Sequence, residues 1–193
     1  MVITPIKEIP MSLITLPTID TAPEASRPTM QALRENFGFL PNVLATMGAN
    51  PVLLNGFAGA FSAYHGGGFD ECERQVLLLT NAVTLRCPWT IAAHSTFALE
   101  DGLTVQEVDD LRAGRLPANP RYAALSQLAR LILEKHGVIS DREITAFTAA
   151  GFVKEQVFEV ILSVGLSTMT AATTNLARTP IEDHFMAQVP SAA

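Results

Sequence analysis

The sequence of 193 residues predicts an all-α fold. Apolar residues recur at the spacing of amphipathic helices, as in 121–136, where Leu125, Leu128, Ile132 and Leu133 form one stripe. Glycine, proline and capping residues separate such segments at short intervals. Alternating β-branched runs between turn signals are absent from the sequence, so no strand is predicted. We expect a helical bundle with the functional site at the start of a central helix.

The predicted helices follow one another along the chain. They cover 26–37, 43–47, 51–65, 71–86, 88–100, 104–113, 121–136, 141–150 and 154–175. Asp70 is a suitable N-cap, and Ser140 with Glu143 resembles a capping box. The helix over 71–86 is apolar on nearly all sides in its middle, which is typical of a central buried helix.

The segment after this helix reads Arg-Cys-Pro-Trp-Thr-Ile-Ala-Ala-His-Ser over residues 86–95. Its proline suits a first helical turn, which places Cys87 at or near the N-cap and Thr90 in the first turn. The free N–H groups and the positive dipole end at that position favour a thiolate. Thr90 lies four residues before His94 and Cys87 seven before it, so one helix face can present all three.

Structural roles stay open for several of these residues. A lone cysteine often acts as a small buried hydrophobe, and a histidine in an apolar context is also consistent with the core. We expect His65, at a helix end, to interact with the C-terminal dipole, although it could also reach the site. Glu182, Asp183 and His184 are consecutive and point in different directions, so they predict a solvated surface. Neither a metal nor another cofactor is expected.

The pattern Cys-x-x-[Cys]-x-x-x-His, on the second of two consecutive helices, resembles the signature of the alkylhydroperoxidase D-like family. This family includes the carboxymuconolactone decarboxylases. Residues 39–43, 92–95, 151–161 and 175–185 also resemble its peroxidase-related members. The resemblance extends from about Phe37 to Phe185 and implies an alkylhydroperoxidase D-like helical bundle, a homo-oligomer and a thiol site at Cys87.

Two positions depart from the family pattern. Thr90 stands where the second thiol is expected, and Gln75 stands where the proton-relay glutamate is expected, twelve residues before Cys87. Because a disulfide needs two thiols, the standard dithiol cycle is not available to this pair of positions. The resemblance therefore implies a site made of Cys87, His94, Thr90 and Gln75. Cys72, between two glutamates, is expected to be the less reactive cysteine.

Three functions are consistent with this sequence. The first is antioxidant peroxide reduction by Cys87 alone, a peroxidase weakened by the missing thiol and recycled by an external thiol reductant. The second is a non-redox acid/base enzyme, such as a small lactone or keto-acid decarboxylase, with His94 carrying protons. The third is a catalytically inactive oligomeric ligand-binding protein. Whether the chain is an enzyme stays open at this stage.

Composition narrows the expected partners. Hydrophobic residues make up 48% of the sequence and charged residues 17%, against a usual charged share of about 25%. We therefore expect subunits of a homo-oligomer to bury part of the surface. The net charge is −6 and the 13 basic residues are dispersed, which argues against nucleic-acid binding. The expected small-molecule substrate is a peroxide or a small organic acid.

The sequence also predicts the domain organisation and the cellular compartment of the protein. Residues 1–23, with four prolines, predict an extended N-terminal arm, and residues 24–193 predict a single domain. The start of the sequence lacks a signal-peptide pattern, and no stretch reaches the roughly 18 uninterrupted apolar residues of a membrane span. Two cysteines suggest a reducing compartment. A soluble cytoplasmic protein without membrane contact is expected.

Overall fold

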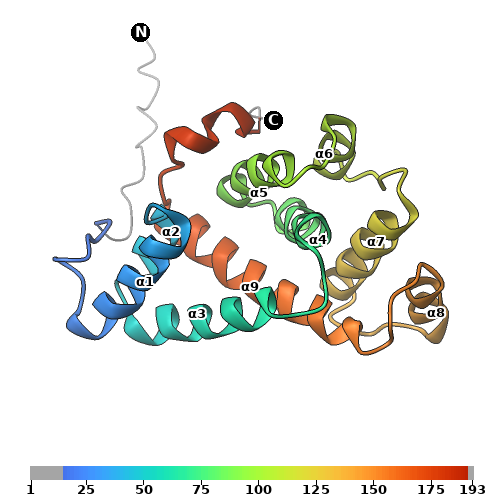
Figure 1. The fold of residues 1–193 in the computed structure, drawn as a ribbon, viewed down its shortest axis with the longest axis horizontal. Helices are drawn as coiled ribbons and strands as arrows, with labels where there is room; N and C mark the ends of the chain where they lie inside the picture. Colours follow the sequence, from blue (N-terminus) through green and yellow to red (C-terminus); the bar gives the residue numbers. More distant parts are fainter. Residues whose placement is uncertain (1–14, 191–193) are drawn as a thin grey trace, which may run out of the picture.

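The computed structural model describes residues 15–190, and that range is helical without a strand (Figure 1). The helices are α1 (Arg27–Phe37), α2 (Asn42–Met47), α3 (Pro51–His65), α4 (Glu71–Thr84), α5 (Pro88–Glu100), α6 (Val105–Arg112), α7 (Pro120–Glu134), α8 (Asp141–Ala149) and α9 (Gln156–Ala177). Two short 3-10 helices, η1 (Glu24–Ser26) and η2 (Asp183–Gln188), flank them. The predicted all-α fold is confirmed, and the predicted helix bounds agree within two residues at each end.

Helix α4 lies in the middle of the bundle (Figure 1). It packs against α5, α6, α7 and α9. Residues 73–82 are all buried, including the polar ones. This agrees with the prediction of a central helix whose middle is apolar on nearly all sides.

Helix α9 crosses the bundle and packs against α2, α3, α4, α5 and α7. Within residues 15–190 it is the one helix long and apolar enough, by composition, to span a membrane. Only 39% of its most apolar 18-residue window is buried. Its inner face therefore belongs to the core of the bundle, while its outer face is uncovered in a single chain.

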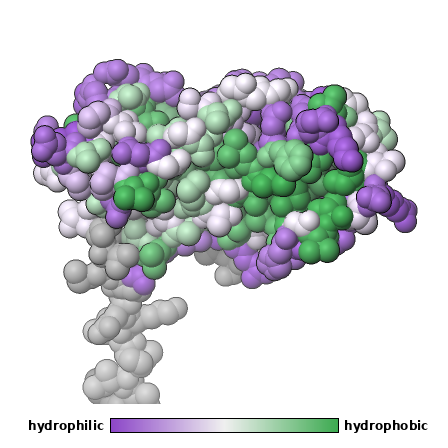
Figure 2. All heavy atoms as spheres, turned by 90° about the horizontal axis from the view of Figure 1, so that it is seen from below, coloured by the Kyte–Doolittle hydropathy of each residue, from purple (hydrophilic) through white to green (hydrophobic). Residues whose placement is uncertain are grey.

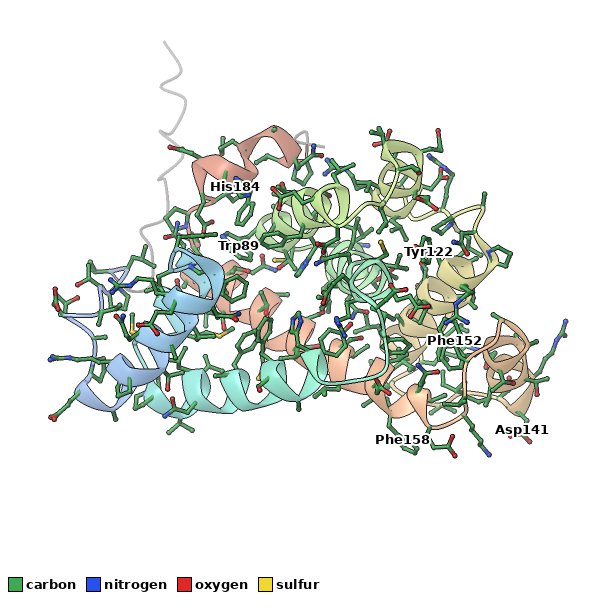
Figure 3. The ribbon with its side chains drawn as sticks, viewed as in Figure 1. Trp89, Tyr122, Asp141, Phe152, Phe158 and His184 are labelled. Carbon is green, nitrogen blue, oxygen red and sulfur yellow. The ribbon has the colours of Figure 1, made fainter. Side chains whose placement is uncertain are left out.

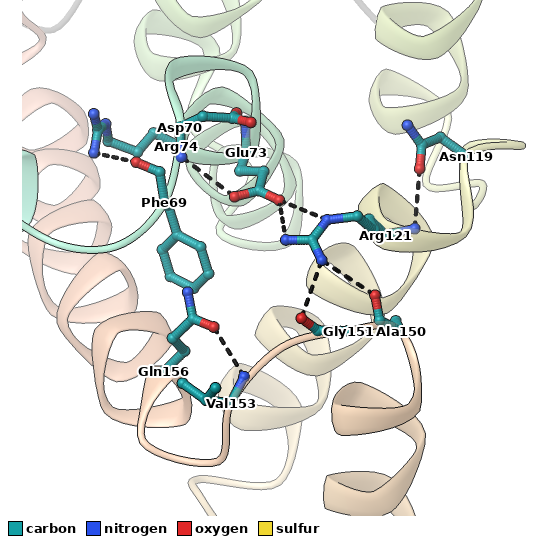
Figure 4. A network of polar contacts seen from close by, with 10 residues as sticks. All are labelled: Phe69, Asp70, Glu73, Arg74, Asn119, Arg121, Ala150, Gly151, Val153 and Gln156. Atoms are coloured by element: carbon teal, nitrogen blue, oxygen red, sulfur yellow. Dashed lines mark hydrogen bonds and ion pairs between the residues drawn. The ribbon is translucent and has the colours of Figure 1, made fainter.

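A partly buried ion pair connects α4 with α7 (Figure 4). The guanidinium of Arg121 lies 2.6 Å from the Glu73 carboxylate, whose side chain is 6% exposed. The same guanidinium donates to the carbonyl oxygens of Ala150 and Gly151 and lies 4.0 Å above the ring of Phe152. Glu73 also closes the capping box at the start of α4. One arginine thus connects α4, α7 and the loop that precedes α9.

The chain before α1 is only partly described. The first fourteen residues of the predicted arm lie outside the described range, and residues 15–23 contain no helix. Leu16 and Ile19 pack against the core, and Ala22 is 1% exposed. The described part of the arm therefore lies on the body of the molecule. The division into an arm and one domain stays a prediction.

The segment after α9 folds back over α5. Phe185 is fully buried against Trp89 and Phe97, with ring centroids 5.7 and 5.3 Å away. The Glu182 carboxylate accepts hydrogen bonds from the Asn42 backbone N–H at 2.6 Å and from the Trp89 indole N–H at 3.0 Å. The prediction of a solvated surface is therefore wrong for Glu182, because these two donors draw its carboxylate inward. Burial raises the pKa of Glu182.

Candidate functional site

Cys87 occupies the junction between α4 and α5. Arg86 takes a left-handed conformation with φ of 54°, which turns the chain between the two helices. Cys87 is the N-cap of α5, and Pro88 opens the first turn. The predicted helix start is thus confirmed. The Cys87 side chain makes no capping hydrogen bond.

Two hydroxyl groups surround the Cys87 thiol, which is fully buried. Its Sγ lies 2.9 Å from Thr90 Oγ1 and 3.1 Å from Thr174 Oγ1. Thr174, on α9, also donates to the Thr170 carbonyl at 2.9 Å. Thr90 was predicted from its spacing to Cys87. Sequence reasoning missed Thr174, because a threonine 87 residues away in a Ser/Thr-rich helix gives no signal.

His94 belongs to a different hydrogen-bonded group. Its Nδ1 lies 2.9 Å from Gln75 Oε1, and Gln75 Nε2 donates to Asp101 Oδ2 at 2.9 Å. A carboxylate only accepts hydrogen bonds, so the amide nitrogen of Gln75 must face Asp101 and its oxygen must face His94. The amide oxygen in turn needs a donor, which places the imidazole proton on Nδ1. The lone pair of His94 is therefore on Nε2.

The imidazole of His94 is neutral at ordinary pH. Burial, followed by the positive charge that His65 can carry, lowers the pKa of His94 to about 4. The Nε2 atom has no hydrogen-bond partner among the described residues. His94 thus offers an acceptor that is held in one orientation and is not protonated near neutral pH.

An aromatic cavity of about 160 Å³ lies beside His94. Its walls include Phe37, Phe57, Phe61, Trp89, Phe97 and Phe185, and its polar lining comes from His65, Gln75, His94 and Thr170. Figure 3 shows Trp89 near the start of α5, beneath the η2 segment that carries His184. None of the described residues that line this cavity is an aspartate, glutamate, lysine or arginine. The cavity therefore suits an uncharged molecule.

His65 lines the same cavity. Burial lowers its pKa, which is the opposite of what a favourable interaction with a helix C-terminus would do. His65 stands in the last turn of α3, as predicted, and it also reaches the cavity, which was the alternative interpretation. The aromatic rings of Phe61 and Tyr64 lie against the imidazole, with centroids 4.3 and 5.8 Å away.

Comparison with known proteins shows what the central part of the chain resembles. Residues 51–131, from α3 into α7, match the model of the carboxymuconolactone decarboxylase family. The match covers 81 of the 193 residues, so it relates the central part of the chain to this family. No curated protein matched the sequence significantly.

Solved structures share the fold of this chain. An alkylhydroperoxidase core structure, an uncharacterized peroxidase-related protein from Ralstonia eutropha JMP134, has a TM-score of 0.80 at 19% identity, covering 94% of this chain and 99% of that one. A peroxidase-related protein from Silicibacter sp. TM1040 has a TM-score of 0.76 at 18% identity, covering 96% and 98%. The debrominase Bmp8 has a TM-score of 0.75 at 18% identity, covering 91% and 95%. At these identities the likeness concerns the fold.

The four predicted site residues fall into two pairs. Cys87 contacts Thr90, and His94 contacts Gln75. No hydrogen bond links Cys87 to His94 among the described residues. Gln75 and His94 line the aromatic cavity, whereas neither Cys87 nor Thr90 does so in the part of the chain that the structure describes. The predicted helix face brings Thr90 to Cys87, but His94 contacts Gln75 on α4 instead, so the three residues do not form one site.

Cys72 also lies away from the cavity. It is partly exposed, and its Sγ donates to the Asp101 carbonyl at 3.1 Å. Burial is the main factor that raises its pKa, and nearby carboxylates add to the effect. Both cysteines are free thiols. Within residues 15–190, no group of three or more histidine, cysteine, aspartate or glutamate side chains is placed to hold a metal ion.

Proposed function

We propose that this protein binds a small, neutral, mostly apolar molecule in the aromatic cavity and that His94 accepts a proton from it. The observation that carries the proposal is the fixed Nε2 lone pair of a neutral imidazole at the wall of an aromatic cavity. Such a group is a general base when a bound molecule presents an acidic hydrogen to it. The function is thus the acid/base alternative, and it does not use the cysteine.

The size and lining of the cavity narrow the substrate class. Its volume of about 160 Å³ is close to the ~150 Å³ of an engineered cavity that holds benzene, so a single ring fits. A keto acid would leave its carboxylate without a cationic partner in this lining, which makes a lactone or another neutral ring the better substrate. In the same fold, a cysteine-to-alanine variant of the debrominase Bmp8 was crystallised with 2,3,4-tribromopyrrole, also a single-ring compound.

The low basicity of His94 limits which hydrogen it removes. Each unit by which the pKa of the donor exceeds that of the base costs about 1.4 kcal/mol. A turnover of about 10 per second allows a barrier of about 16 kcal/mol. The donor pKa therefore lies no more than about 11 units above that of His94. Phenols, enols and carbon acids that form a strongly delocalised anion meet this limit, and ordinary alcohols and C–H groups do not.

The fate of the proton follows from Gln75. Proton transfer turns the substrate into its anion and His94 into an imidazolium that carries protons on both nitrogens. A carboxamide does not take up the Nδ1 proton as a glutamate would, so Nε2 gives its proton back. Return to a second position of the substrate gives an isomerised product and restores the neutral imidazole. Proton exchange at Nε2 with water leads instead to isotope exchange.

Deuterium exchange tests this function. The protein is incubated in D₂O with 2(5H)-furanone, an unsaturated lactone whose ring CH₂ group forms a delocalised anion, and deuterium uptake is followed by NMR. We expect exchange above the buffer rate, a loss of about 100-fold in His94→Gln, and no loss in Cys87→Ser. His136→Asn replaces an exposed histidine and is the matched control. Exchange that persists in His94→Gln rules out His94 as the base. Binding without exchange indicates the ligand-binding alternative.

Single-thiol peroxide reduction is the second candidate. The Thr90 hydroxyl beside Cys87 Sγ favours it, because it is placed to donate to a thiolate. In this reaction Cys–SH and ROOH give Cys–SOH and ROH, and two molecules of an external thiol then restore Cys–SH with release of a disulfide and water. Peroxide must first reach a thiol with 0% exposure, so α5 and α9 would have to separate at Thr174.

Peroxide consumption distinguishes the candidates. With dithiothreitol as reductant, peroxidase function predicts turnover that Cys87→Ser abolishes and His94→Gln leaves in place. The acid/base proposal predicts the reverse dependence for lactone exchange. Because each variant removes a different reacting group, the two assays together assign the activity.

A further inference from the structure

A chain of hydrogen bonds leads from the surface to the cavity. We propose that Asp101 is a positioning residue that fixes the protonated nitrogen of His94 through Gln75, and that it thereby restricts the cavity to hydrogen-bond-donating ligands, namely neutral ring compounds with a hydroxyl or ring N–H group. The inference rests on the proposed binding of a neutral molecule in this cavity. It does not depend on proton transfer.

The geometry of the three residues is continuous. Asp101 is the C-cap of α5, and Gln75 lies one turn into α4. The Gln75 amide lies between the Asp101 carboxylate and the His94 imidazole, 2.9 Å from each. Gln75 itself is 7% exposed, so water does not readily replace either partner. The orientation of one amide group thus connects the exposed carboxylate to the cavity wall.

The carboxylate decides this orientation. Were the amide reversed, its oxygen would face a carboxylate oxygen, and one charge-assisted hydrogen bond would be lost. A hydrogen bond to a charged group is strong enough to favour one orientation by about tenfold to a hundredfold. The favoured orientation puts the proton on Nδ1 of His94. Nε2 is then an acceptor and rejects a ligand that offers only another acceptor.

His65 does not impose the same restriction. It lines the cavity, but no described residue hydrogen-bonds to its ring. The imidazole packs against the rings of Phe61 and Tyr64. In its neutral form this imidazole can place its proton on either nitrogen, so it adapts to a donor or an acceptor. Discrimination between ligands therefore falls to His94.

The test uses two ring compounds of similar size. Cyclohexanol donates a hydrogen bond, and cyclohexanone only accepts one. Trp89 is the only tryptophan in the chain and lines the cavity, so its single indole N–H signal in a ¹H–¹⁵N spectrum reports binding. For the parent protein we expect cyclohexanol to bind at least about tenfold more tightly than cyclohexanone. The ketone oxygen and Nε2 of His94 are both acceptors, so cyclohexanone forms no hydrogen bond with His94.

The Asp101→Asn variant should remove this preference. The new amide can donate to Gln75 Oε1, Gln75 can then donate to Nδ1 of His94, and the imidazole proton moves to Nε2. We expect the ratio of the two dissociation constants to fall to about 1–3. The ¹⁵N shifts of His94, assigned by comparison with His94→Gln, should change from the Nδ1–H form to a mixture of both tautomers. A purely structural role of Asp101 would not move these shifts.

Asp109→Asn is the matched control, since Asp109 is exposed on α6 and the same charge is removed. It should keep both the preference and the Nδ1–H form. An unchanged tautomer in Asp101→Asn overturns the positioning role. A parent protein that prefers cyclohexanone, or that binds neither compound, overturns the ligand class. Deuterium exchange of the lactone is measured separately. If proton transfer fails, the binding and tautomer measurements still test the role of Asp101.

Discussion

The Sγ atom of Cys87 lies 2.9 Å from Oγ1 of Thr90, one turn along α5. The three-residue spacing at a helix start predicts this contact, and Thr90 is 1% exposed, so its hydroxyl points inward to the thiol. The family pattern expects a second thiol at this position. A disulfide between the two positions therefore requires only a small adjustment of the side chains.

We predict that Thr90→Cys forms a reversible disulfide with Cys87. The exchange replaces a hydroxyl by a sulfur of similar size, so the free energy of unfolding of the reduced protein should change by about 1 kcal/mol or less. Mass spectrometry of the peptide after mild oxidation should show the loss of two hydrogens. Thr96→Cys, on the same helix but without a contact to Cys87, is the control and should not form this link. An unlinked Thr90→Cys protein would contradict the observed contact.

The sequence predicts the helices well because each carries its own start and stop signals, such as the Ser140 capping box and the proline after Cys87. The local part of the site is equally predictable: Cys87 with Thr90 depends on one helical turn. Contacts between distant segments are not. Thr174, Asp101 and the inward position of Glu182 arise from packing of α9, the end of α5 and the C-terminal segment, and no spacing in the sequence encodes them.

We predict that Cys72 reacts before Cys87 in the folded protein. The sequence favours the opposite order, because it places Cys87 at a helix start. Burial reverses the expectation: Cys87 is fully buried and Cys72 is partly exposed. Since the pKa of Cys72 is raised, its labelling should be slow at pH 7 and faster at pH 9.

Labelling with limiting iodoacetamide, followed by peptide mapping, measures this order. Both cysteines should react readily in denaturant, which controls for the recovery of the two peptides. Labelling that begins at Cys87 in the folded protein would show that α5 and α9 open more often than the packing suggests. That outcome would strengthen the peroxidase candidate.

We predict a loss of stability in acid that depends on His94. Its folded-state pKa of about 4 lies below the ~6.5 of an unfolded histidine. The neutral form is thus favoured by folding, and its stabilisation is complete above pH 6.5 and lost as the pH falls through 6.5 towards 4. At pH 4 the loss amounts to about 3 kcal/mol. Denaturant unfolding of the parent and of His94→Gln between pH 7 and pH 4 isolates this contribution. Parallel pH curves for the two proteins would refute the prediction.

Hydrophobic residues gather on the face of the molecule seen from below in Figure 2. Phe158, at the start of α9, points down towards this side in Figure 3 and is 72% exposed. Ile161 on the same helix is 47% exposed, and Val153, in the preceding loop, is 59% exposed. Exposed apolar residues grouped in this way are typical of surfaces that associate. Together with the low charge content, they support the expected homo-oligomer and indicate α9 as its contact helix.

We predict that Phe158→Lys weakens this association. A lysine on the contact surface would have to lose its hydration or point away from the partner subunit. Either outcome removes the hydrophobic contact that Phe158 makes, and burial of a phenylalanine side chain stabilises by about 2 kcal/mol. Light scattering across micromolar concentrations should therefore report an oligomer for the parent and a smaller species for Phe158→Lys. Val138→Lys is the matched control, because Val138 is 79% exposed and lies between α7 and α8. A monomeric parent would contradict the expected homo-oligomer. If Phe158→Lys behaves like the parent, as Val138→Lys should, the contact surface lies elsewhere than α9.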